Sequence, residues 1–195
     1  MYLSQDALDY VLSAKDELMD LERTLCAIPS PSHQEHRRAA FCKEWLEKAG
    51  AKGVYIDEVQ NVIFPINAEG SSRLTLFAAH MDTVFPDTEP MPMWEEDGIL
   101  YCPGAGDDTG SVALVLMISK YLISRNIQPE DGFLMVCNTC EEVDQSGITH
   151  VVDAYQGRLK EAYMMDGLYN QVVNWPVAYQ KYKVHIHAQG GHAYL

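Results

Sequence analysis

The chain is organised around Gly104-Ala105-Gly106-Asp107-Asp108-Thr109-Gly110, which sets two adjacent carboxylates among glycines immediately before the apolar run 112–122. Apolar residues recur in that run at helical spacing, so it predicts a helix with Asp107 and Asp108 at its N-terminus. A helix dipole offsets only about 1 kcal/mol of the repulsion between two carboxylates. A bound divalent cation would offset far more, so the stretch indicates a metal site. For this stretch alone, an aspartate N-cap beside a solvated neighbour is an equally good interpretation.

Three short, nearly continuous apolar runs predict buried strands at 74–79, 132–136 and 162–165. Predicted helices over 112–125 and around 148–155 alternate with them, which indicates an α/β fold, a mostly parallel sheet flanked by helices. Histidine or acidic side chains follow the strands in turn: His80 and Asp82, then Glu141 and Glu142, then Asp166. Sites in such sheets form at the carboxyl ends of the strands, so these side chains should converge with Asp107. One histidine among several carboxylates predicts a hydrolytic metal site.

The remaining segments complete the predicted organisation. Amphipathic patterns predict helices over 5–26 and 33–49, and strand-like segments occur at 54–56 and 62–64. Beyond position 170, the segment 179–188 alternates polar and apolar residues, as a half-exposed antiparallel strand does. We therefore predict one α/β domain over 1–174 and the beginning of another over 175–195. His185 and His187 share a face of that last strand, and His192 stands beside glycines in the turn after it.

Two of the motifs have a specific chemical use. In His80-x-Asp82 both side chains lie on one side of an extended strand end, so the carboxylate can accept one imidazole N–H and leave the other nitrogen for a metal. In Glu141-Glu142 the neighbours point differently, so one can bind a metal while the other acts as a general base. Taken singly, a capped strand-terminal histidine explains the first motif equally well, and an acidic loop explains the second better.

Composition limits the compartment and the partners. With 195 residues, of which 47% are hydrophobic, the chain can bury a substantial core. Its formal net charge of −14 argues against nucleic acid and anionic membranes as partners and favours divalent cations. The first residues lack the basic and apolar regions of a signal peptide, and no apolar run approaches a membrane span. We therefore expect a cytoplasmic protein.

The cysteines fit the same compartment. Five is an odd number, which suits reduced intracellular thiols better than a disulfide framework. Cys137 and Cys140 have the spacing of a redox CxxC motif or of half a zinc knuckle. No second CxxC or suitably spaced Cys/His pair accompanies them, so small buried thiols are the favoured interpretation.

Taken in order, these motifs resemble those of the co-catalytic zinc metallopeptidase family that includes peptidase T, aminoacylase, acetylornithine deacetylase and succinyl-diaminopimelate desuccinylase. Each matching segment alone is weak evidence for the resemblance, whereas the whole set in the same order is specific. The segments are Ile28-Pro29-Ser30-Pro31-Ser32, Asn61-Val62, His80-Met81-Asp82-Thr83-Val84, Gly104 to Gly110, Glu141-Glu142, Met165-Asp166-Gly167 and Gly191-His192-Ala193.

The resemblance implies a pair of zinc ions bridged by Asp107, with Co²⁺ or Mn²⁺ as alternatives. His80 and Asp166 would bind one ion, and Glu142 would bind the other. The resemblance also implies a cis peptide bond after Asp107.

The catalytic roles implied by the resemblance belong to other residues. Asp82 would orient His80. Glu141 would be the general base that takes a proton from water as it attacks an amide carbonyl of a small peptide or N-acyl amino acid. His192 would help hold the oxyanion, reaching the site of a partner subunit in a homodimer formed by an inserted lid domain, of which 175–195 would be the first strand and turn.

The sequence also departs from the family. Ala188 replaces a usual glycine and the usual proline after His192 is absent, which leaves the placement of that histidine open. The family's last metal-ligating histidine would lie beyond Leu195, so the sequence corresponds to the N-terminal portion of such an enzyme. Lidless aminopeptidases with the same ligand order are a rival interpretation, which the strand and turn at 179–192 oppose. An inactive fragment that binds metal or a partner subunit is another, and a CxxC redox protein is a weaker third.

Overall fold

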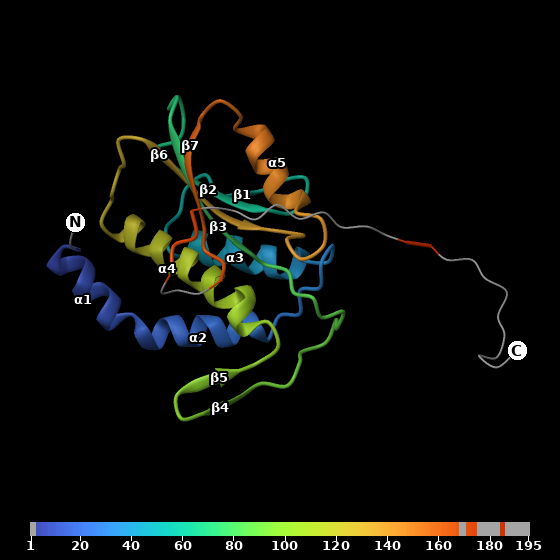
Figure 1. Ribbon diagram of the computed structural model, residues 1–195. Coiled ribbons are helices and arrows are strands. Elements are labelled where there is room, and N and C mark those ends of the chain that lie inside the picture. Colours follow the sequence, from blue (N-terminus) through green and yellow to red (C-terminus); the bar gives the residue numbers. More distant parts are fainter. Residues whose placement is uncertain (1–2, 168–170, 175–183, 186–195) are drawn as a thin grey trace, which may run out of the picture.

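The computed structural model describes residues 3–167, 171–174 and 184–185 (Figure 1). The helices are α1 (Gln5–Ser13), α2 (Lys15–Cys26), α3 (His36–Lys48), α4 (Gly110–Ser124) and α5 (Ser146–Ala154), and a π-helical turn, η1 (Ala105–Thr109), precedes α4. The strands are β1 (Tyr55–Ile56), β2 (Val62–Ile66), β3 (Leu74–His80), β4 (Trp94–Glu96), β5 (Ile99–Tyr101), β6 (Gly132–Asn138) and β7 (Leu159–Met164). His187 and His192 lie outside the described residues, so the domain at 175–195 stays a prediction. His185 is described and is exposed.

The main sheet has the strand order β1-β2-β6-β3-β7 and carries helices on both faces, so the predicted α/β fold is confirmed. Its centre is parallel, because β3 pairs in parallel with β6 on one side and with β7 on the other. The sheet as a whole is mixed, since β2 runs antiparallel to both β1 and β6. A parallel crossover needs a dozen or more residues, and the connection 67–73 between β2 and β3 is too short to provide one.

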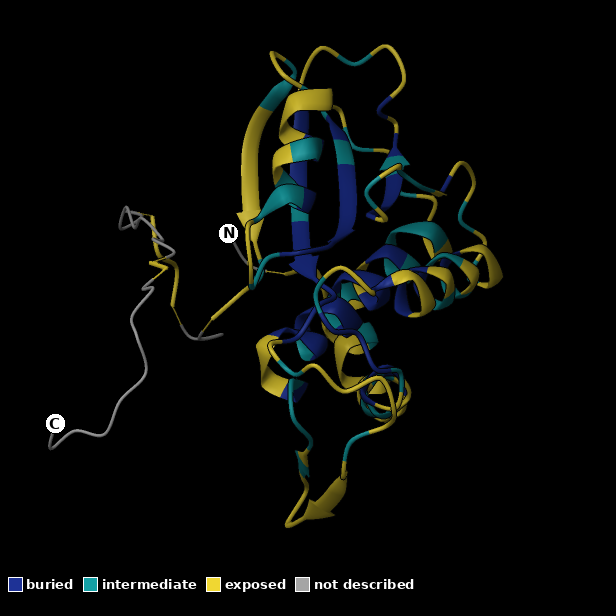
Figure 2. Ribbon diagram, turned by 90° about the vertical axis from the view of Figure 1, so that its right-hand side faces the viewer, coloured by how far each residue is buried: buried dark blue, intermediate teal, exposed yellow. Residues whose placement is uncertain are grey.

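Each face of the sheet buries its own hydrophobic cluster (Figure 2). On one face α2, α3 and α4 cover residues such as Phe64 and Met135, while on the other α5 covers Leu76 and Val136. Strand β3 is buried along almost its whole length, as the sequence predicted for 74–79. The prediction of a buried strand at 162–165 was wrong in its burial, because β7 is an edge strand and is mostly exposed among the described residues.

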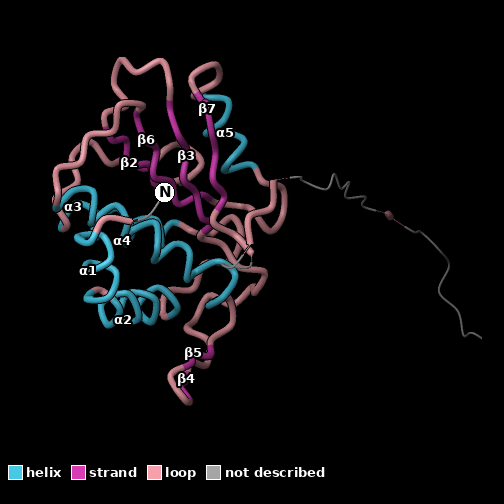
Figure 3. Tube along the Cα trace, turned by 60° about the vertical axis from the view of Figure 1, so that its left-hand side comes forward, coloured by secondary structure: helices cyan, strands magenta, loops and turns pink. Residues whose placement is uncertain are grey.

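The helices differ from the predicted ranges mainly at the N-terminus. The single helix expected over 5–26 is two helices, α1 and α2, which meet at Ala14. Helix α1 buries no residue, and Tyr10 docks it on α4 by donating a hydrogen bond to the Met117 carbonyl oxygen, 3.0 Å away. The β4–β5 hairpin extends beyond α2 (Figure 3). None of the helices in the described part of the chain is long and apolar enough to cross a membrane.

Candidate metal centre

Three side chains from separate parts of the chain meet at the carboxyl end of the parallel strands. His80 ends β3, Asp107 lies in η1 and Asp166 follows β7. A ligand atom of each lies within 4.8 Å of the others, and His80 Nε2 lies 3.1 Å from Asp107 Oδ1. One imidazole and two carboxylates suit a catalytic zinc site, which has three protein ligands. The structure therefore brings these three predicted ligands together.

The imidazole of His80 is held between two aspartates. Its Nδ1 lies 3.0 Å from the carbonyl oxygen of Asp82 and 3.4 Å from Asp82 Oδ1, while Nε2 faces Asp107. Burial lowers the pKa of His80, but the hydrogen bond to Asp82 and the charges of Asp108, Asp82 and Glu141 outweigh it and raise that pKa to about 10. The field that favours a proton on this ring would equally favour a metal cation beside it.

Asp82 has a wider role than orienting the histidine. The side chain is fully buried, and its two carboxylate oxygens accept hydrogen bonds from the backbone N–H groups of Glu141 and Glu142 at 3.0 and 3.2 Å. Ser32 Oγ adds a third hydrogen bond at 2.7 Å. Burial raises the pKa of Asp82, but these hydrogen bonds and the one to His80 outweigh it and lower the pKa below its usual value. Asp82 thus fixes the backbone of Glu141 and Glu142 relative to His80, a predicted metal ligand.

The two neighbouring glutamates face different surroundings. Glu141 lines a cavity of about 260 Å³ together with His80 and Asp166, and its Oε1 accepts a hydrogen bond from Gln145 Nε2 at 3.2 Å. Burial and the nearby charge of Asp107 raise the pKa of Glu142. Among the described residues, no third ligand joins Asp107 and Glu142 in a metal-binding group.

Asp108 points inward where Asp107 points outward. The peptide bond between them is cis, as the resemblance implied. The Asp107 side chain is 68% exposed, whereas Asp108 is 1% exposed and its Oδ2 accepts the backbone N–H of His80 at 3.0 Å. Burial raises the pKa of Asp108 to about 7. Its Oδ1 is buried without a hydrogen-bond partner among the described residues. Asp108 lines the cavity together with His80 and Asp166, so the donor set here fits a cation.

The comparisons with known proteins agree with this geometry. Residues 76–189 match the model of peptidase family M20/M25/M40. The chain belongs to this family. It is 32% identical over 157 residues to a putative LysW-lysine/LysW-ornithine hydrolase of Pyrococcus abyssi, covering 74% of this chain and 45% of that protein. It is 29% identical over 150 residues to succinyl-diaminopimelate desuccinylase of Bordetella avium, covering 72% of this chain and 39% of that protein.

Solved structures share the fold. Human carnosine dipeptidase 1 matches 85% of this chain and 41% of its own with a TM-score of 0.68 at 18% identity. Aminopeptidase PepT of Bacillus cereus matches 78% of this chain and 43% of its own with a TM-score of 0.63 at 20% identity. The chain thus spans about half the length, or less, of the relatives it matches.

A buried arginine supports this candidate metal centre, and no sequence pattern indicates its role. Arg38 is 2% exposed, and its guanidinium donates hydrogen bonds to the Met81 carbonyl oxygen at 2.8 Å and to Thr109 Oγ1 at 3.2 Å. It also donates to the carbonyl oxygens of Ile28 and Leu25 at 2.7 and 3.0 Å. The end of α2, the end of β3 and the metal loop 104–110 are therefore joined through one side chain.

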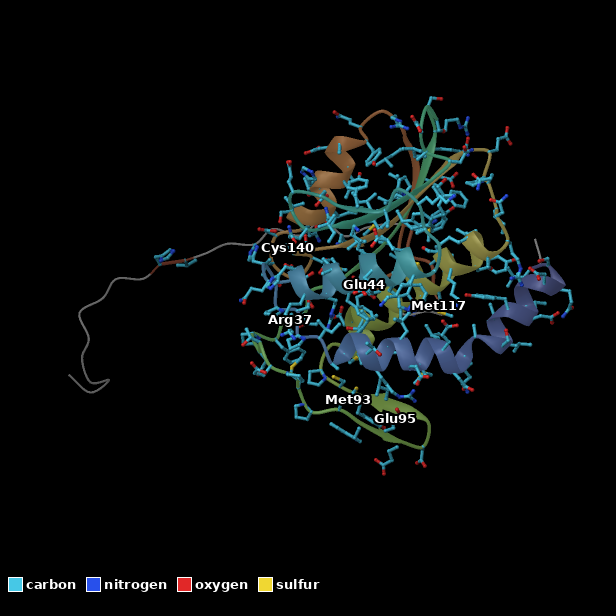
Figure 4. The ribbon with its side chains drawn as sticks, turned by 180° about the vertical axis from the view of Figure 1, so that it is seen from behind. Arg37, Glu44, Met93, Glu95, Met117 and Cys140 are labelled. Atoms are coloured by element: carbon cyan, nitrogen blue, oxygen red, sulfur yellow. The ribbon has the colours of Figure 1, made fainter. Side chains whose placement is uncertain are left out.

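Glu35, 3% exposed, is a second buried support. Its Oε1 accepts the backbone N–H groups of His33 and Cys140 at 3.1 and 3.0 Å, which places Cys140 beside the N-terminal end of α3 (Figure 4). Cys140 has a φ of +56° and immediately precedes the two glutamates. The sequence pattern does not reveal that Glu35 and Arg38 support the site. Their roles depend on hydrogen bonds to backbone groups that lie far away in the sequence.

The CxxC interpretation finds no support in the site. The Cys137 thiol is fully buried, and the neighbouring Cys42 thiol together with burial raises its pKa. Burial and the charge of Glu35 raise the pKa of Cys140. Redox-active thiols have a lowered pKa and an accessible sulfur, and neither cysteine has both.

Proposed function

We propose that the protein is a zinc-dependent hydrolase that cleaves an amide bond in a small peptide or an N-acyl amino acid. The observation that carries this proposal is the cavity that Glu141 shares with His80 and Asp166, beside Asp107. His80, Asp107 and Asp166 would hold one ion. Asp107 and Glu142 would contribute to the other, with Co²⁺ or Mn²⁺ as alternative metals.

Bound zinc would lower the pKa of water and polarise the substrate carbonyl. Glu141 would take the proton of the attacking water and return it to the nitrogen of the leaving amine. Gln145 orients the Glu141 carboxylate through the hydrogen bond to its Oε1. Asp82 holds the backbone of Glu141 and the ring of His80 at once, so the base and the first metal ligand keep a fixed separation.

The proposed substrate class is based on the names of the relatives. One relative is named a LysW-lysine/LysW-ornithine hydrolase. The names of two others, a succinyl-diaminopimelate desuccinylase and a carnosine dipeptidase, support an N-acyl amino acid or a small peptide as the substrate. We further propose a cytoplasmic homodimer in which His192 of one subunit completes the site of the other through the lid domain.

A second candidate function is the binding of a metal or a partner subunit without turnover. The observation that favours it is that the second ion would have only Asp107 and Glu142 as ligands among the described residues.

One assay separates the two functions. The chain is loaded with zinc and incubated with dipeptides and N-acetyl amino acids, and released amine is measured for wild type and Glu141→Gln. Turnover that Glu141→Gln loses while keeping its zinc supports the hydrolase. Zinc binding without wild-type turnover supports the second candidate, and equal turnover in both proteins would show that Glu141 is not the base.

A further inference from the structure

We propose that an apolar cleft beside the metal loop 104–110 binds a large apolar side chain of the substrate, by preference an aromatic one. The cleft lies between the β4–β5 hairpin and the start of the metal loop, and its volume is about 480 Å³. Its lining includes Pro92, Trp94, Leu100, Tyr101, Pro103 and Gly106. This substrate class rests on the proposed function, because the side chain would belong to the substrate of the same hydrolase.

The walls of the cleft are uncharged and partly aromatic. No charged side chain lines it in the described part of the chain, although 22% of all residues are charged. The rings of Trp94 and Tyr101 stack with their centroids 5.2 Å apart and their planes within 3° of parallel. Trp94 is nevertheless 54% exposed and Tyr101 38% exposed. An apolar or aromatic group would cover this ring surface, whereas a charged group would find no opposite charge in the lining.

The hairpin is fastened to the body of the protein, so the cleft is formed before a ligand arrives. Arg23 of α2 donates hydrogen bonds from Nε and Nη2 to the two carboxylate oxygens of Glu95, the second of them at 3.0 Å. This ion pair is partly exposed, so it contributes to the position of the hairpin more than to stability. A site that is already formed keeps the entropy cost of binding low.

The cleft ends at the metal loop. Gly104 has a φ of +76° and packs so closely on Thr83 that a Cβ there would lie 2.6 Å from Thr83 Cγ2, which holds the start of the loop in place. Gly106 has open space instead, since a Cβ there would meet no atom within 4 Å apart from its chain neighbours. The next residue is the proposed metal ligand Asp107, and consecutive Cα atoms are about 3.8 Å apart. The side chain of a substrate bound at the metal would therefore reach the cleft.

Calorimetric titration of the zinc-loaded full chain tests the cleft. The ligands are L-phenylalanine, L-alanine and L-lysine, which are products of N-acyl amino acid hydrolysis and are not consumed. We expect phenylalanine to bind roughly tenfold or more tighter than alanine, because the cleft would bury its ring. Lysine should bind more weakly than phenylalanine. Amide hydrogen exchange over segment 92–106 should slow when phenylalanine is added, which locates the ring at the cleft.

Two variants of the hairpin sharpen the test. Trp94→Ala should lose the preference for phenylalanine over alanine and keep its zinc content. Ile99→Ala is the matched control and should keep the preference, because Ile99 lies on the same hairpin and is also 54% exposed but does not line the cleft. If Trp94→Ala does not fold, the wild-type titration and the exchange measurement decide the matter.

Four results would overturn the inference. They are equal affinities of the wild type for phenylalanine and alanine, tighter binding of lysine, a preference that survives Trp94→Ala, and unchanged exchange over 92–106. The proposed function fails separately. A wild type that prefers phenylalanine but never hydrolyses N-acetyl-L-phenylalanine would contradict the hydrolase and support the cleft, whereas hydrolysis of N-acetyl-L-phenylalanine and N-acetyl-L-alanine with equal kcat/KM would contradict the cleft alone.

Discussion

Arg38→Met tests the buried junction behind the metal centre. Methionine fills the space of the arginine stem but leaves four acceptors without the guanidinium, namely the carbonyl oxygens of Leu25, Ile28 and Met81 and the hydroxyl of Thr109. The Leu25 carbonyl oxygen keeps its hydrogen bond from the Ile28 N–H, so three acceptors are left unpaired. At about 1 kcal/mol or more for each unpaired buried acceptor, the loss is about 3 kcal/mol. Burial lowers the pKa of Arg38, so removing its charge returns part of that cost, and we expect a net loss of about 2 kcal/mol.

The assay is urea unfolding of the zinc-free chain, because bound metal would add its own stabilisation. Arg37→Met is the matched control, since Arg37 is the exposed neighbour on the same helix, and its change should stay within about 0.5 kcal/mol. Equal losses in the two variants, or a loss below about 1 kcal/mol for Arg38→Met, would refute the role given to the buried guanidinium.

The remaining predictions concern the ligands and the second buried support. Asp107→Ala should lose more zinc by atomic absorption than His80→Ala, because Asp107 alone would touch both ions, and equal zinc contents would contradict the shared ligand. Glu141→Gln should keep its zinc and lose about a hundredfold or more of any hydrolysis, whereas Glu142→Gln should bind zinc more weakly and recover part of its activity in excess zinc. The opposite pattern would show that the two roles are exchanged. Glu35→Ala should lower the free energy of unfolding by about 1 kcal/mol or more, since it leaves the buried N–H of Cys140 unpaired, while the exposed Gln34→Ala should not.

The ends of the strands could be predicted well because buried apolar residues give way there to polar side chains. Apolar runs gave β3 and β6, and the polar residues directly after them marked the edge where His80, Asp107 and Asp166 meet. The reversed direction of β2 was readable only from the short connection 67–73, since periodicity does not report strand direction. The exposure of β7 follows from its edge position, which an apolar pattern does not disclose.

The residues that hold the site in place could not be predicted from the sequence in the same way. Asp82 was predicted as a partner of His80, but its bonds to the backbone of Glu141 and Glu142 join residues far apart in the chain. Arg38 looks like an ordinary polar residue of an amphipathic helix until its distant acceptors are known. His192 lies outside the described residues, so its role stays a prediction.

Zinc titration by calorimetry tests the metal centre most directly. In the proposed site, His80, Asp107 and Asp166 would supply three ligands for one ion, while the other would have only Asp107 and Glu142 among the described residues. We expect one tight site and one weak site, with the tight site lost in His80→Ala. Two equally tight sites would contradict this ligand division, and no zinc binding, or tight binding that survives His80→Ala, would contradict the metal centre itself.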